Sequence, residues 1–208
     1  PKLEKIQQSG SSLNRILNDV LDMSKLNAGK LTIESIPFDL VATVKNGISF
    51  YTQLAQDKGI SLNVDIDKTV NTDVVGDAVR LLQILNNLVS NAIKFTSTDE
   101  KTQGHVKISV EVVHNTTDHF TLRFCVTDNG KGMSQTQLRE IFNPFIQAEN
   151  SITREYGGTG LGMSITNSLV TLMQGTIDLT SAVNKGTSIR VILPLKQVEL
   201  APKPLELK

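Results

Sequence analysis

One amphipathic helix pattern followed directly by two long strand patterns constrains the fold of this 208-residue chain most strongly. Within residues 77–95, apolar side chains recur every three to four positions, and the segment contains no proline. Residues 106–113 and 120–127 are rich in β-branched and aromatic side chains, and a short polar segment separates them. The two periodicities in close succession predict a mixed α/β unit. On the buried side of the helix we expect Val79, Leu82, Ile84, Leu85, Leu88, Val89 and Ala92.

Further elements are predicted on both sides of this region. Helix patterns cover residues 2–27, 40–57, 134–142 and 160–174, and strand patterns cover residues 31–38, 60–66, 176–181 and 187–193. The first helix is either part of the core or an arm that packs against a helix outside this domain. Its position before any strand favours the arm. The end of the chain from Lys196, with two prolines, is typical of a linker.

Composition excludes several kinds of protein. Lys and Arg number 21, as do Asp and Glu, so the net charge is zero. The chain therefore lacks the overall excess of positive charge that is typical of proteins that bind nucleic acid. The single cysteine, Cys125, excludes an intrachain disulfide and a cysteine-cluster metal site. No apolar run approaches the roughly 18 to 20 residues that span a bilayer. Because the chain begins with Pro1, we expect it to be a fragment of a longer protein.

The helix predicted at residues 77–95 has a polar face that carries two asparagines and a lysine. Asn87 and Asn91 are four residues apart, and Lys94 lies one turn further along. Two amide oxygens and an ammonium suit a hard cation together with phosphate oxygens, because Mg²⁺ prefers oxygen ligands. The alternative is an ordinary solvated helix face.

Two glycine-rich clusters follow. Asp128 comes directly after a strand pattern, and an ionised carboxylate there can accept a hydrogen bond from the exocyclic amine of adenine but not from guanine, which presents an acceptor. Residues 157–163 are rich in glycine and open a helix, where backbone N–H groups can bind an anion. They do not form a Walker A loop, since Met163 occupies the position of the lysine. Each cluster, taken alone, is equally compatible with a turn.

Taken together and in this order, the clusters resemble the ATP-binding catalytic domain of sensor histidine kinases of the hybrid type. This is the Bergerat fold, shared with DNA gyrase, MutL and the large heat-shock chaperone ATPases. The N box is similar to residues 87–96, the G1 box to 128–132, the F box to 142–145 and the G2 box to 157–162. The resemblance implies a two-layer α/β sandwich with a mixed, mainly antiparallel sheet of about five strands and helices on one face. It also implies three segments, namely the second helix of a truncated dimerisation domain at 1–27, the catalytic domain at 28–195 and a linker tail at 196–208.

The resemblance also implies roles for individual residues. Asn91 would bind Mg²⁺, Asn87 would support the phosphate and metal region, Lys94 would meet the phosphates, and Asp128 would bind the adenine amine. Phe95 would lie against the adenine, and Thr187 would complete its pocket. The remaining implied nucleotide contacts are Gly130 and Gly132 in the turn, Gly158, Thr159, Gly160, Leu161 and Gly162 around the phosphates, and Arg154 within an ATP lid at 147–157 whose base Phe142 and Phe145 anchor.

The phosphate-accepting histidine of the family has no counterpart in the chain. His105, His114 and His119 lie in or beside strand patterns, and no acidic residue follows any of them. We therefore expect the chain to bind Mg·ATP and to deliver the γ-phosphoryl to a histidine on a missing helix, for relay to an aspartate of a response-regulator receiver domain. The parent would be a homodimer and a membrane-anchored sensor with this domain in the cytoplasm. The alternatives are an ATPase clamp of the gyrase or chaperone kind and a non-catalytic nucleotide-binding module.

Overall fold

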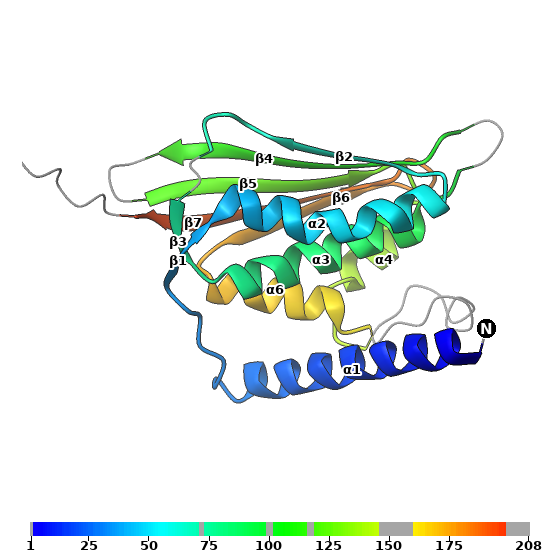
Figure 1. Cartoon of the computed structure of the whole chain (residues 1–208), viewed down its shortest axis with the longest axis horizontal. Helices are drawn as coiled ribbons and strands as arrows, with labels where there is room; N and C mark the ends of the chain where they lie inside the picture. The colour runs from blue at the N-terminus through cyan, green and yellow to red at the C-terminus, as the bar shows by residue number, and fades with distance from the viewer. Residues whose placement is uncertain (1, 71–72, 99–101, 116–118, 146–159, 199–208) are drawn as a thin grey trace, which may run out of the picture.

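The computed structural model describes residues 2–70, 73–98, 102–115, 119–145 and 160–198 (Figure 1). Its helices are α1 (Lys2–Asn27), α2 (Leu40–Asp57), α3 (Ala78–Phe95), α4 (Gln135–Glu140) and α6 (Gly162–Leu172). Its strands are β1 (Ile36–Asp39), β2 (Ser61–Ile66), β3 (Asp73–Gly76), β4 (His105–Asn115), β5 (His119–Asp128), β6 (Thr176–Ser181) and β7 (Thr187–Gln197). In the part of the chain that the structure describes, no helix is both long and apolar enough to cross a membrane.

The strands form one seven-stranded sheet with the order β1-β3-β7-β5-β4-β2, and β6 also pairs with β7. All neighbours are antiparallel except β2 and β4, which are parallel. The long strand β7 pairs with β5 along one edge, and its other edge is shared by β6 and the short β3. The predicted mixed, mainly antiparallel sheet is therefore confirmed, but it has seven strands rather than about five.

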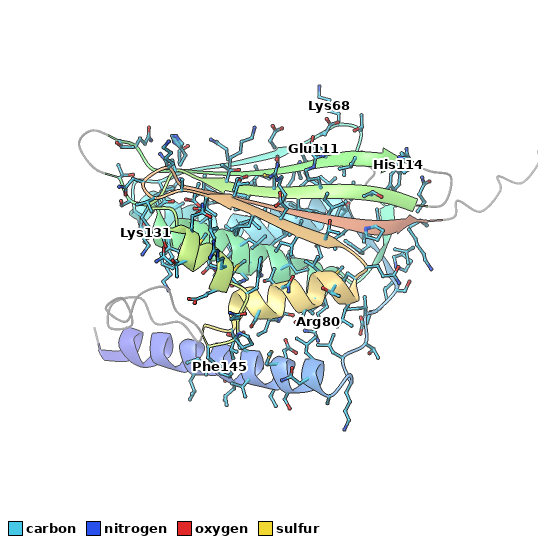
Figure 2. The ribbon with its side chains drawn as sticks, turned by 180° about the vertical axis from the view of Figure 1, so that it is seen from behind. Lys68, Arg80, Glu111, His114, Lys131 and Phe145 are labelled. Carbon is cyan, nitrogen blue, oxygen red and sulfur yellow. The ribbon has the colours of Figure 1, made fainter. Side chains whose placement is uncertain are left out.

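Helices α2, α3 and α6 cover one face of the sheet, and α1 lies on the far side of this helix layer (Figure 1). The core between the layers contains side chains such as Phe124, Leu122 and Val191, all fully buried. The other face carries cross-strand ion pairs, including Arg123–Glu111 at 3.0 Å and Lys107–Asp65 at 3.3 Å (Figure 2). Alternation of apolar and charged residues along each strand explains why helices cover only one face.

Side-chain caps define where three of the helices begin. Asp39 accepts a hydrogen bond from the backbone N–H of Ala42 at the start of α2. Asp77 does the same for Arg80 at the start of α3, and Ser134 forms a capping box with Gln137 at the start of α4. Each cap satisfies a backbone donor that the helix itself cannot satisfy, a contribution of about 1 kcal/mol.

Several predicted element boundaries were wrong. Of the strand predicted at 31–38, only the end is extended in the sheet, and Leu31 is buried through packing of the connecting segment rather than in a strand. The short strand β3 was not predicted, and β7 continues to Gln197 because its end pairs with β3. Val79, expected inside, is 66% exposed, whereas Leu81 of the same helix is fully buried.

Candidate functional site

The polar face of α3 is organised by one amide side chain. Asn87 donates from Nδ2 to Thr166 Oγ1 of α6 at 2.8 Å, and its Oδ1 accepts from Asn91 Nδ2 at 3.3 Å. Both ends of the Asn87 amide are therefore used inside the protein. Among the described residues, no donor reaches the carbonyl oxygen of Asn91. In the part of the chain that the structure describes, that oxygen is therefore available to a ligand.

The start of α6 packs directly against Asn87. A Cβ on Gly162 would lie 2.3 Å from Asn87 Oδ1, so only glycine fits this position without displacing the amide. Gly160 has a φ of +69°, and Leu161 is buried in the core. The structure thus brings these three predicted residues to the N-terminal end of α6, beside the polar face of α3.

Asp128 ends β5 at the edge of the helix layer. Its Oδ1 accepts a hydrogen bond of 2.8 Å from the backbone N–H of Gly130. Burial raises the pKa of the Asp128 carboxyl above its ordinary value of 3.8, and the backbone N–H groups of Gly130 and Thr187 offset part of that rise. A carboxylate has about four lone-pair positions, so two backbone donors leave capacity for a ligand amine.

Glycines hold the turn after β5 tightly against the β6–β7 hairpin. Gly132 has a φ of +62°, and a Cβ there would lie 1.9 Å from the carbonyl oxygen of Ala182. The next residue, Met133, donates its N–H to Ser181 Oγ at 2.9 Å. The same hydroxyl lies 3.0 Å from Thr187 Oγ1, which connects the predicted Thr187 to the turn.

The same turn contacts the end of α3 around Phe95. The backbone N–H of Lys131 donates to the carbonyl oxygen of Phe95 at 3.2 Å, and a Cβ on Gly130 would lie 2.3 Å from that oxygen. Two ammonium groups lie over the Phe95 ring, with Lys94 Nζ 4.9 Å and Lys131 Nζ 5.0 Å from its centroid. Sequence reasoning had not selected Lys131, because a lysine between two glycines of a turn gives no signal of its own.

The predicted F box reaches the start of α6. Phe142 is half-buried against the core, whereas Phe145 is 72% exposed and has a φ of +65°. The N–H of Phe145 donates to the carbonyl oxygen of Gly160 at 3.2 Å, which brings residues 145 and 160 together. The segment expected to form a lid, and with it Arg154, Gly158 and Thr159, lies outside the described residues.

Four separate segments therefore form one site. Thr166 links α3 to α6, Lys131 links α3 to the turn after β5, and Ser181 links that turn to the hairpin. The site combines an amide oxygen on α3, ammonium groups near its C-terminal end and a carboxylate at the end of β5. This combination suits a ligand with an anionic end, an associated cation and an amine-bearing ring.

Known proteins resemble this chain in both sequence and fold. The profile of the family described as histidine kinase-, DNA gyrase B- and HSP90-like ATPase matches residues 76–197. The autoinducer 2 sensor kinase/phosphatase LuxQ of Vibrio parahaemolyticus is 36% identical over 206 residues, 99% of this chain. The signal transduction histidine-protein kinase BarA of Escherichia coli is 41% identical over 186 residues, 89% of this chain.

A crystal structure of full-length ShkA in complex with AMPPNP superposes with a TM-score of 0.77 and 26% identity. The superposition covers 94% of this chain and 38% of the ShkA chain. The matched regions make up 23% of LuxQ and 20% of BarA, so this chain spans about a fifth of the length of those relatives.

Proposed function

The chain belongs to the family of histidine kinase-, DNA gyrase B- and HSP90-like ATPases, and we propose that it is the Mg·ATP-binding catalytic part of a protein-histidine kinase. In this proposal the γ-phosphoryl group passes from ATP to an imidazole nitrogen of a histidine on another helix. A nitrogen–phosphorus bond forms as the oxygen–phosphorus bond to ADP breaks. The observation that carries the proposal is that contacts join α3, which bears Asn91 and Lys94, to the start of α6 and to the turn after Asp128. Groups suited to the two chemically different ends of ATP therefore lie on connected elements.

The base end of the nucleotide would be held at the turn after β5. Asp128 would accept a hydrogen bond from the adenine amine and would reject guanine, which has an acceptor at that position. Phe95 would lie against the ring, and Thr187 would complete the pocket beside Asp128. The close contacts of Gly130 and Gly132 support this assignment, since they fix the position of the carboxylate.

The phosphate end would be held between α3 and α6. Lys94 would contact phosphate oxygens, and backbone N–H groups at the start of α6 would do the same. Asn91 fits a magnesium ligand, because its carbonyl oxygen has no donor among the described residues whereas both ends of the Asn87 amide are used. The metal, when bound with ATP, would neutralise part of the phosphate charge. Asn87 would act indirectly by holding Asn91 and α6.

We further propose that α1 is the second helix of a dimerisation domain, that the following residues form the catalytic domain, and that the chain ends in a linker. Its partners would be the helix that carries the acceptor histidine and a receiver domain with a phosphorylatable aspartate. The parent protein would be a homodimeric, membrane-anchored sensor with this part in the cytoplasm. The names of two relatives, a sensor kinase/phosphatase and a signal transduction histidine-protein kinase, support the signalling role within these proposals.

The three histidines of the chain make poor internal acceptors, since His105 and His114 lie on β4 and His119 begins β5. The test is transfer of radiolabelled phosphate from ATP. We expect no acid-labile label on this chain alone, but slow labelling of a separate polypeptide that supplies the upstream helix and its histidine. Transfer is slow because no covalent link raises the local concentration of the acceptor.

The same assay distinguishes the two alternatives. An ATPase clamp would hydrolyse ATP steadily and label nothing, and a non-catalytic module would do neither. Labelling of His105, His114 or His119 in the isolated chain would contradict the proposal, because the acceptor would then lie within this sequence.

A further inference from the structure

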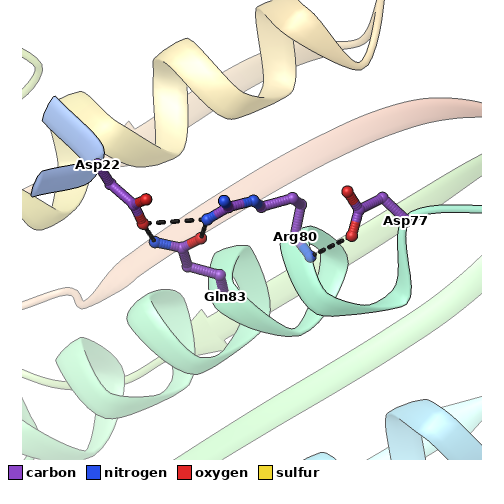
Figure 3. Close-up of polar contacts among 4 residues, drawn as sticks. All are labelled: Asp22, Asp77, Arg80 and Gln83. Atoms are coloured by element: carbon purple, nitrogen blue, oxygen red, sulfur yellow. Dashed lines mark hydrogen bonds and ion pairs between the residues drawn. The ribbon is translucent and has the colours of Figure 1, made fainter. Parts of the chain in front are cut away.

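A polar cluster joins the long helix α1 to the first turns of α3 (Figure 3). Asp22 Oδ2 accepts hydrogen bonds from Arg80 Nη1 at 3.0 Å and from Gln83 Nε2 at 2.8 Å. Arg80 Nη1 also donates to Gln83 Oε1 at 2.7 Å, which closes a triangle of three side chains. The side chains of Arg80 and Asp22 are only 21% and 14% exposed, so this ion pair is shielded more than the pairs on the open face of the sheet.

Arg80 occupies an unfavourable position within its own helix. It is the third residue of α3, after the cap Asp77, and a positive charge in the first turn opposes the helix dipole. The side chain is therefore stabilised by its contacts with Asp22 and Gln83 rather than by the dipole of α3. This makes the interaction between the two helices specific in position and in charge.

The apolar contact beside this cluster leaves a hollow between α1 and the helix layer. Met23 and Leu26 pack against the core, but Val20, Met23, Phe145 and Leu161 line a hollow of about 510 Å³. Phe145, which Figure 2 labels next to α1, is 72% exposed. Among the described residues these side chains do not fill the space, so this apolar contact constrains α1 less than a close-packed one would.

The chain has a hinge immediately after α1. Leu31 is buried in the core, and the backbone N–H of Glu34 donates to Asp77 Oδ2 at 3.0 Å, so the segment from Leu31 onward is fixed to α3. Between α1 and Leu31 lie three exposed residues, 28–30, of which Gly29 has a φ of +63°. The backbone N–H groups of residues 28–30 donate to carbonyl oxygens in the last turn of α1, so these residues would move with the helix. The pivot therefore lies between them and the buried Leu31.

The length of α1 amplifies small rotations. Its 26 residues extend over about 39 Å, so a tilt of about 10° at the hinge displaces the far end by roughly 7 Å. Asp22 lies close to the hinge, and its contact with Arg80 fixes the orientation of the whole of α1. Transfer of a phosphoryl group requires the two reacting atoms to lie about 3 to 3.5 Å apart and to be aligned for attack.

We propose that Asp22, Arg80 and Gln83 form an orientation latch that fixes the angle of α1 relative to the nucleotide-binding helix α3. Arg80 is thus a positioning residue. The latch itself does not depend on nucleotide binding. Its consequence for catalysis, the distance between the nucleotide and the acceptor helix, rests on the proposed function.

The test is a distance measurement between spin labels by double electron–electron resonance in the whole chain. Labels are attached at Asn14→Cys on α1 and Asn63→Cys on β2, both exposed positions, after Cys125→Ser removes the native thiol. Labelled chains are diluted with unlabelled chains so that only intramolecular pairs contribute. In the parent chain we expect one narrow distribution of distances between the labels. In Arg80→Gln, the fraction of molecules with distances outside that distribution should be about fivefold larger than in the parent.

A charge swap and a matched control make the result decisive. Asp22→Arg combined with Arg80→Asp should restore the narrow distribution, since each new charge suits the dipole of its own helix. Arg190→Gln, which removes the exposed ion pair with Asp178 on strands away from both labels, should change nothing. Equal distributions in the parent chain and Arg80→Gln, or failure of the swap to restore order, would overturn the latch. Nucleotide affinity, measured in parallel, should be unchanged in Arg80→Gln, so loss of the latch and loss of the proposed function are separate results.

Discussion

Replacing Asp128 by asparagine should separate ligand binding from stability. Hydrogen bonds to charged groups contribute about 1.5–3 kcal/mol, so loss of the bond to the adenine amine should weaken ATP binding about 10- to 150-fold. Asparagine keeps an oxygen that can accept the 2.8 Å bond from Gly130. Isothermal titration calorimetry at pH 7 measures the change in affinity directly, and GTP provides a control ligand that should bind weakly to both proteins.

The stability of the nucleotide-free protein should respond in the opposite direction. Because burial raises the pKa of Asp128 in the folded state, the carboxylate opposes folding at neutral pH. This unfavourable contribution is present above the raised pKa and disappears as the pH falls toward 3.8. At pH 7, Asp128→Asn should therefore unfold at the same or a higher temperature than the parent chain, and any advantage should shrink at lower pH.

The pH dependence of binding provides a second check on Asp128. ATP affinity of the parent chain should fall as the pH is lowered through the raised pKa, since a protonated carboxyl offers a donor to the amine. The variant lacks this titration. If Asp128→Asn bound ATP as tightly as the parent, or lost binding only together with its folded structure, the assignment of this carboxylate to the base would be refuted.

Three further substitutions examine other parts of the site, and a fourth, at Gly10, serves as a control. Asn91→Ala should weaken nucleotide binding strongly in Mg²⁺ but little in EDTA, as measured by calorimetry; an equal loss in both would indicate a packing role. Gly132→Ala should lower the free energy of unfolding in urea by at least about 1–3 kcal/mol, because its φ is +62° and its Cβ would clash with backbone. Gly10→Ala, on a helix with open space around it, should be neutral or stabilising. Lys131→Met should reduce ATP affinity about two- to fivefold by removing one of the two cations that hold the Phe95 ring.

The elements that could be predicted from sequence are those with an amphipathic pattern over many residues and a capping residue beside it. Helix α2 begins and ends where its pattern predicted, and α3 begins directly after Asp77, because apolar spacing and a capping aspartate act within one segment. The short strand β3 has no such signal. Its four residues become a strand only because β1 and β7 lie on either side. The error at Leu31 has the same origin, since alternation alone does not distinguish a strand from a packed connection.

The site shows a similar division between local and distant information. Asn87, Asn91 and Lys94 could be placed on one face from their spacing in a single helix. The hydrogen bond between the Asn87 amide and Thr166 could not be predicted, since those residues are 79 positions apart. Likewise, the approach of Lys131 to Phe95 depends on how a turn meets a helix end. Sequence patterns identified the candidate residues, and tertiary contacts decided which atoms remain available to a ligand.

Because the site is built from two layers, different elements of the protein would contact the two ends of a nucleotide. Asp128 belongs to the sheet and its turns, whereas Asn91 and the start of α6 belong to the helix layer. ATP and ADP share the same base and differ only in the terminal phosphate. Under the proposed function, Asp128 on the sheet would distinguish the base, and Asn91 with the start of α6 would respond to the presence of the terminal phosphate. Because α1 contacts α3 through Asp22 and Arg80, a change in α3 on loss of the terminal phosphate would reach the long helix directly under the proposed function.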